Sequence, residues 1–159
     1  MMAILERASE RLALMQRTRS VAIIGMSANP SRASHFVATY LTGRTDWRLY
    51  YVNPRETEIL GQHVYGSLAD LPEPPDMVDV FRRIEDLPSV VQDSIDVGAT
   101  AVWFQLGLIH EQAAADASTA GLDVVQNRCL KIEHARFAGG LHCAGFVTGV
   151  IDNRRSRLV

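Results

Sequence analysis

Cysteine is scarce in this chain of 159 residues, which contains only Cys129 and Cys143. Two cysteines cannot form the disulfide framework of a small secreted protein, and their spacing is not that of a metal site. Long apolar stretches are also missing, since no run approaches the ~18 residues that a membrane-spanning helix needs. The first residues mix acids with bases and lack the apolar stretch of a secretory signal. We therefore expect a cytoplasmic protein with no membrane role.

A strong excess of one charge is absent as well. The 16 basic and 18 acidic residues leave a formal net charge of −2, and no basic block interrupts the sequence. Binding the phosphate backbone of nucleic acid requires a concentrated positive face, so nucleic acid is not the expected partner. The apolar fraction of 47% and the length fit one globular domain with a single core.

Short apolar runs alternate with longer segments of helical periodicity along most of the chain. Glycines follow the helical segments at the position that ends a helix in a left-handed turn: Gly43, Gly98 and Gly121. The predicted strands are Val21–Gly25, Arg48–Asn53, Met77–Phe81, Ala101–Gln105 and Asp123–Gln126, and the predicted helices are Ala33–Thr42, Glu85–Val97 and Glu111–Ala120. Such alternation predicts an α/β fold with a parallel sheet between two layers of helices.

Two segments depart from this alternation. Residues 1–19 carry apolar side chains at helical spacing and are expected to pack as an extra helix. Residues 53–75 are expected to form a turn, a small hairpin around Gly61 and a short helix after Ser67. The prediction is a three-layer, Rossmann-like doubly wound domain over residues 20–137, with about five parallel strands in the order 3-2-1-4-5 and an arm over 138–159.

The end of the first strand is where such folds bind an anion. The dinucleotide fingerprint has three glycines here, whereas this sequence has only Gly25. Serine hydroxyls at 27, 31 and 34, the Arg32 guanidinium and the start of the next helix can all donate to phosphate. The alternative is an ordinary helix start in which Ser34 is the cap and Arg32 is solvated.

The end of the second strand differs from that of an NAD-binding domain, which usually has an acid for the ribose 2′-hydroxyl. This sequence has Asn53, Pro54 and Arg55 instead. An arginine without a carboxylate favours a ligand whose ribose carries its own phosphate, as in NADP and in coenzyme A (CoA). The alternative is that Asn53 and Pro54 simply form the turn that leaves the strand.

The third strand ends with an aromatic side chain and two basic ones. Phe81 can cover an adenine ring, and Arg82 and Arg83 follow it directly. Because adjacent residues of a strand point to opposite faces, we expect one of the two arginines to reach a phosphate. The other is expected to pair with Glu85 or Asp86.

The fourth and fifth strands bring further residues to the same edge. Gln105 lies at the end of the fourth strand, while Arg128 and Cys129 follow the fifth. An adjacent arginine can lower the pKa of a cysteine thiol, although a lone cysteine is more often a small buried apolar residue.

In their order, these segments resemble the CoA-binding domain family. The resemblance covers about residues 20–137 and rests on VAIIGMSANPSRASHFVATYL, YYVNP, EILGQHVYGSLADLP, DMVDVFRR, GATAVWFQLGLIHEQAAADASTAGLDVV and NRCLKIEH. This family includes the module that opens the α subunit of succinyl-CoA synthetase and the ADP-forming acyl-CoA synthetases, as well as small standalone proteins. The resemblance implies CoA binding across the strand ends, with the first turn near the phosphates. The sequence departs from the family at Met26, where a small residue is usual, and at Gln126-Asn127, where a Met-Asp pair is common.

The candidate site contains no predicted metal ligand and no catalytic residue, since the five histidines form neither a triad nor a metal motif. We expect a non-catalytic carrier, sensor or regulatory module that binds CoA or an acyl-CoA, with a second subunit or protein partner at the arm. The alternative is a small NADP-binding oxidoreductase, and a third hypothesis is a mixed disulfide between Cys129 and CoA. The predicted binding residues are Gly25, Met26, Ser27, Arg32, Ser34, Asn53, Pro54, Phe81, Arg82, Arg83, Gln105, Arg128 and Cys129.

Overall fold

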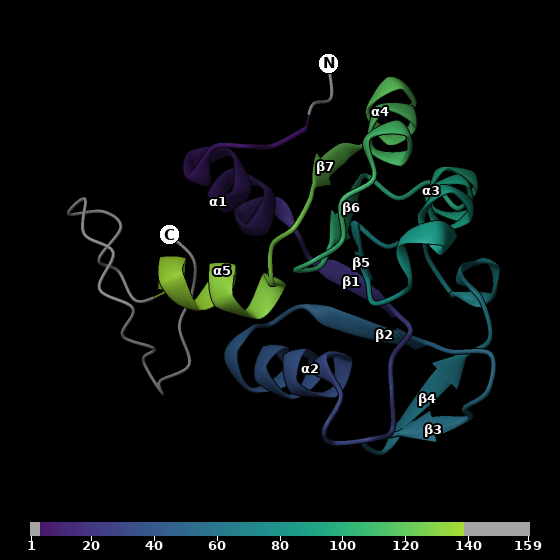
Figure 1. Ribbon diagram of the computed structural model, residues 1–159. Helices are drawn as coiled ribbons and strands as arrows, with labels where there is room; N and C mark the ends of the chain where they lie inside the picture. Colours follow the sequence, from purple (N-terminus) through teal and green to yellow (C-terminus); the bar gives the residue numbers. More distant parts are fainter. Residues whose placement is uncertain (1–3, 139–159) are drawn as a thin grey trace.

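The computed structural model, which describes residues 4–138, has a mostly parallel sheet with helices on both faces. The predicted arm lies, apart from Ala138, outside the described residues. Figure 1 shows the elements in chain order. The strands are β1 (Ser20–Ile24), β2 (Arg48–Val52), β3 (Glu58–Ile59), β4 (Gln62–Tyr65), β5 (Met77–Val80), β6 (Ala101–Phe104) and β7 (Asp123–Val125). The α-helices are α1 (Ala8–Arg17), α2 (Ala33–Arg44), α3 (Leu87–Asp96), α4 (Glu111–Thr119) and α5 (Leu130–Ala138), and short 3-10 helices cover Leu68–Asp70 and Ile84–Asp86.

The sheet has seven strands in the order β3-β4-β2-β1-β5-β6-β7, which corrects the predicted order. The prediction placed the strand at Met77 outside β2, but β5 pairs in parallel with β1. The position outside β2 belongs to β4, which pairs in parallel with β2 and antiparallel with β3. The hairpin around Gly61 is therefore part of the sheet. Its turn suits this role because Leu60 and Gly61 both have the positive φ that a tight hairpin needs.

The five predicted strands are all present, and each one ends a residue earlier than predicted. The first residues beyond these strands are Gly25, Asn53, Phe81, Gln105 and Gln126. The amides of Gly25, Asn53 and Phe81 still bond to neighbouring strands, but these residues lie at the carboxyl edge of the sheet. Among the predicted helix stops, Gly98 and Gly121 have positive φ as expected. The helix stop predicted at Gly43 was wrong, because α2 continues through this residue to Arg44.

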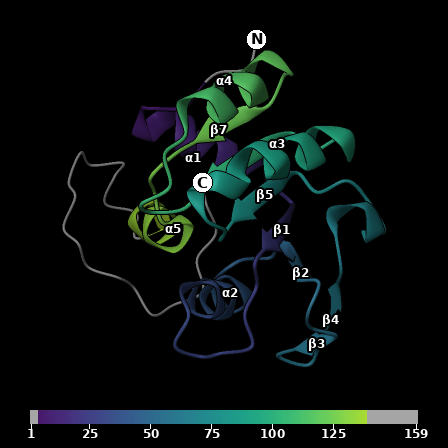
Figure 2. The same ribbon diagram turned by 45° about the vertical axis from the view of Figure 1, so that its right-hand side comes forward.

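Two apolar clusters lie on opposite faces of the sheet. Alternate residues of the strands, such as Ile23 and Trp103, pack with α1, α2 and α5. Their neighbours in the strands, such as Ala22 and Val102, pack with α3 and α4. Figures 1 and 2 show these two layers of helices on either side of the sheet. This is the three-layer arrangement that the continuously buried strands predict.

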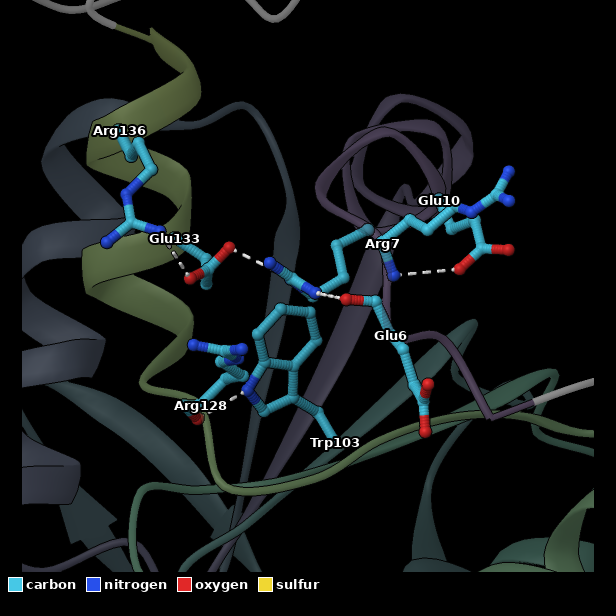
Figure 3. Close-up of polar contacts among 8 residues, drawn as sticks. Glu6, Arg7, Glu10, Trp103, Arg128, Glu133 and Arg136 are labelled. Atoms are coloured by element: carbon cyan, nitrogen blue, oxygen red, sulfur yellow. Dashed lines mark hydrogen bonds and ion pairs between the residues drawn. The ribbon is translucent and has the colours of Figure 1, made fainter. Parts of the chain in front are cut away.

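The N-terminal segment and α5 are joined by a buried ion pair. Arg11 of α1 donates through Nε to Glu133 Oε2 of α5 at 3.0 Å, and both side chains are buried. A second Arg11 nitrogen donates to the Glu6 carbonyl at 2.6 Å, and Arg136 donates to the other Glu133 oxygen (Figure 3). The helix in the N-terminal segment covers only Ala8–Arg17, since Ile4 instead forms a bridge beside Val124 of β7.

None of the helices within residues 4–138 has the length and apolar character required to cross a bilayer.

Candidate functional site

A cavity of about 730 Å³ lies at the carboxyl ends of the central strands. The order of strand addition reverses here: the chain runs from β1 through α2 to β2 on one side, and β5, β6 and β7 follow on the other side of β1. Doubly wound sheets bind their ligands at such a switch point, and this volume is within the range of small-molecule sites. The cavity is lined by Gly25, Ser27, Arg32, Ala33, Ser34, Asn53, Arg55, Phe81, Arg82, Gln105, Leu106, Leu108, Cys129 and Ile132.

Gly25 allows β1 and β5 to meet at the base of this cavity. Its φ is +80°, a conformation that side chains disfavour, and a Cβ atom at this position would lie 2.0 Å from the Phe81 carbonyl oxygen. The backbone of the first turn can therefore pass over the end of β5 only without a side chain. A single glycine suffices because the closest approach is at one residue.

The loop between β1 and α2 is held by its own serines. The Ser27 amide donates to Ser34 Oγ at 3.0 Å, and the Asn29 amide donates to Ser27 Oγ at 3.1 Å. Ser34 is consequently buried and is not the helix cap. The cap residue is Arg32, whose side chain makes no capping hydrogen bond. The start of α2 therefore borders the cavity without a side-chain cap. Such a helix start attracts anions through its amide groups.

Asn53 forms the turn that leaves β2. Its Nδ2 donates to the Met26 carbonyl at 2.8 Å, and its Oδ1 accepts from the Arg55 amide at 2.8 Å. Asn53 therefore forms the turn, as the alternative interpretation proposed. This turn brings Arg55 to the cavity wall.

The polar end of the cavity is positively charged. Arg32, Arg55 and Arg82 line the wall, and no acidic side chain of the described residues does. Arg82 lies 3.5 Å from Asp86, a half-exposed pair that contributes little stability. Arg83 points elsewhere, with a side chain 78% exposed and paired with Glu85 and Asp86. Of the two adjacent arginines, one thus reaches the cavity, and the other forms surface ion pairs.

The end of the cavity that follows β6 and β7 in the strand order is apolar. Leu106, Leu108 and Ile132 line it together with Cys129, and Leu106 is 67% exposed. Sequence reasoning missed these apolar residues and Ala33. Leu106 and Leu108 directly follow the fourth strand, a signal that was available. Ile132 was missed because α5 was not predicted.

Gln105 connects the cavity with a buried acid beneath it. Its Nε2 donates to Asp79 Oδ1, and the Asp79 side chain on β5 is completely buried. Within the described residues, Asp79 Oδ2 has no hydrogen-bond partner. Burial raises the pKa of Asp79 to about 8, against a smaller lowering by the Gln105 hydrogen bond. Sequence reasoning missed Asp79, because a lone acid in an apolar strand gives no pattern.

Four predicted binding residues do not line the cavity. Met26 is wholly buried in the core, so its bulk does not crowd the site. Pro54 is exposed in the turn beyond Asn53, and Arg83 forms the surface pairs described above. Arg128 lies beside a different cavity near Arg11, where its carbonyl accepts a hydrogen bond from Trp103 Nε1 at 2.8 Å (Figure 3).

No group of three histidine, cysteine or acidic side chains within residues 4–138 is arranged to hold a metal ion.

Comparison with known proteins identifies the class of this fold and site. A family model described as "CoA binding domain" matches residues 19–135. The uncharacterized protein YneT of Bacillus subtilis (strain 168) is 34% identical over 122 residues, which are 77% of this chain and 90% of YneT. The chain therefore belongs to the CoA-binding domain family.

Solved structures share this fold. A protein from Thermus thermophilus shares 34% identity with a TM-score of 0.77, and the match covers 82% of this chain and 98% of that one. The dinucleotide-forming acetyl-coenzyme A synthetase 1 of Ca. Korarchaeum cryptofilum matches with a TM-score of 0.63 and 18% identity, over 71% of this chain and 27% of that one. This last likeness is one of fold.

Proposed function

We propose that the protein binds coenzyme A, free or as a thioester, in the cavity at the switch point of the sheet. The observation that carries this proposal is the division of one cavity into an arginine-lined end and an apolar end. CoA has the same division, since its nucleotide carries three phosphate groups and its pantetheine arm is largely uncharged. The bound molecule supplies a thiol that can carry an acyl group.

The residues present fit this ligand in both charge and space. Arg32 and the uncapped start of α2 suit the diphosphate, because both present N–H donors to the same region. Arg55 leaves the turn after β2, where a ribose and its own phosphate would lie. Leu106, Leu108 and Ile132 offer an apolar wall for the pantetheine arm.

The proposed role is that of a standalone carrier, sensor or regulatory module. Family membership supports a CoA site, and it gives no support to the NADP-dependent alternative. Titration with CoA, dephospho-CoA and NADPH by isothermal calorimetry tests the proposal. We expect CoA to bind tightest, and dephospho-CoA to bind about tenfold more weakly because it lacks the phosphate on the ribose. Absence of CoA binding, or tighter binding of NADPH, would contradict the proposal.

Arginine variants test which end binds the phosphates. Arg55→Ala is expected to weaken CoA binding about tenfold and to abolish the preference for CoA over dephospho-CoA. Arg83→Ala is the matched control, since it removes the same charge from a neighbouring surface that does not line the cavity. Equal effects of both substitutions would mean that only the overall charge matters.

A further inference from the structure

Asp79 is a buried acid with an incomplete set of hydrogen bonds. It lies on β5 between Ile23 and Trp103 of the neighbouring strands, and its side chain is 0% exposed. One oxygen accepts the Gln105 amide, while the other has no partner in the described part of the chain. An apolar residue at this position would avoid the cost of burying that oxygen. Asp79 is therefore poorly explained as a contributor to stability.

Gln105 gives Asp79 a connection to the site. Gln105 lines the cavity and directly precedes Leu106, a residue of its apolar end. An amide offers a donor on one side and an acceptor on the other, and it can rotate unless a partner fixes it. Because Asp79 accepts from the nitrogen, the amide oxygen is the group left for the cavity.

We propose that Asp79 is a positioning residue that fixes Gln105, so that the Gln105 amide oxygen faces the cavity and accepts a hydrogen bond from an amide N–H of the pantetheine arm. This inference rests on the proposed function and specifies which part of CoA the apolar end recognises. The raised pKa of Asp79 agrees with a carboxyl group that is buried for a purpose other than surface charge. A fixed acceptor among apolar side chains distinguishes a pantetheine amide from a plain hydrocarbon chain.

The test separates the two ends of the ligand. Calorimetry with CoA and with adenosine 3′,5′-bisphosphate, which lacks the pantetheine arm, is carried out on wild type, Asp79→Leu, Asp79→Asn and Gln105→Leu. We expect Asp79→Leu and Gln105→Leu each to weaken CoA binding about tenfold, the effect of one hydrogen bond, with bisphosphate binding unchanged. Asp79→Asn keeps an acceptor for Gln105 and is expected to retain CoA affinity within about threefold. The double variant Asp79→Leu/Gln105→Leu is expected to bind no more weakly than either single variant.

The outcomes distinguish this inference from the proposed function. If wild type binds neither ligand, the proposed function fails, and the inference fails with it. If wild type binds both but Asp79→Leu weakens them equally, or leaves CoA unaffected, only the inference is overturned. Should Asp79→Leu not fold, Asp79→Val takes its place, because β-branched residues already occupy the adjacent positions of β5.

Discussion

At the scale of single residues, Gly25 is the position where a side chain would damage the site most directly. We expect Gly25→Ala to lower the free energy of unfolding by at least about 2 kcal/mol, because the new Cβ meets the Phe81 carbonyl and φ is positive. Gly61→Ala is the matched control, since Gly61 has a φ of +75° but nothing within 4 Å of an added Cβ. Its expected cost is about 1 kcal/mol. Urea unfolding measures both, and equal losses would show that the close approach to Phe81 is unimportant.

Asp79 gives a second prediction at this scale, on pH. Its pKa is raised from 3.8 to about 8, so between these values the folded chain holds a proton that the unfolded chain has lost. The wild type therefore loses stability as pH rises through this window, by at most about 1.4 kcal/mol per pH unit. Asn cannot ionise, so the free energy of unfolding of Asp79→Asn relative to wild type is expected to increase from pH 5 to pH 8. Urea unfolding at both values checks this, and a constant difference would contradict it.

Single residues also show what sequence reasoning could reach. Sequence reasoning placed Gly25, Arg32, Arg82 and Gln105 at one edge of the sheet, because the carboxyl ends of parallel strands lie at the same edge. Asp79 could not be found in this way. Its role depends on a contact with Gln105 at the end of the neighbouring strand β6, and a contact between strands leaves no local sequence pattern.

At the scale of elements, the predicted strands were right because each is a short, largely apolar run. The strand order was wrong because the hairpin around Gly61 was predicted but not placed in the sheet, where β4 takes the position beside β2. Helix α5 was missed for another reason. Its buried residues include Glu133 and His134, so polar side chains interrupt the apolar stripe that would have predicted it.

The buried ion pair between Arg11 and Glu133 gives a prediction about how α1 and α5 are held together. Arg11→Met is expected to lower the free energy of unfolding by about 3 kcal/mol, because it leaves the buried Glu133 carboxylate without Arg11. The double variant Arg11→Met/Glu133→Met is expected to be more stable than Arg11→Met, since it removes the buried carboxylate and leaves only the partly exposed Arg136 without its partner. Thermal and urea unfolding of the variants measure these differences. Arg83→Met, which affects an exposed pair with Glu85, is the control and should cost less than about 1 kcal/mol. A double variant that is less stable than Arg11→Met would contradict the interpretation.

At the scale of the whole molecule, the direction of the chain connections determines where the two ends of the cavity lie. The loop after β1 and the turn after β2 bring Arg32 and Arg55 from one half of the sheet, and Arg82 follows β5 directly across the switch point. The loop after β6 and the start of α5 bring Leu106, Cys129 and Ile132 from the other half. A ligand that contacts both ends must therefore cross the switch point. Sequence reasoning located the sheet edge but not this division, because it did not place Leu106 and Leu108 at the site and did not predict α5, which carries Ile132.

A cysteine at one end and arginines at the other make this crossing testable. In a Cys143→Ser background, incubation with CoA disulfide is expected to attach one CoA to Cys129: the Cys129 thiolate attacks one sulfur, and the other CoA leaves as a thiolate. Excess adenosine 3′,5′-bisphosphate is expected to slow the reaction, because it occupies the arginine-lined end through which the disulfide is held. Arg55→Ala should slow it as well, whereas Arg83→Ala should not. Intact mass spectrometry over time measures the adduct, with Cys129→Ser as the blank. An adduct that forms at the same rate with the bisphosphate present would show that Cys129 reacts without the nucleotide end being bound, and that the two ends do not hold one ligand.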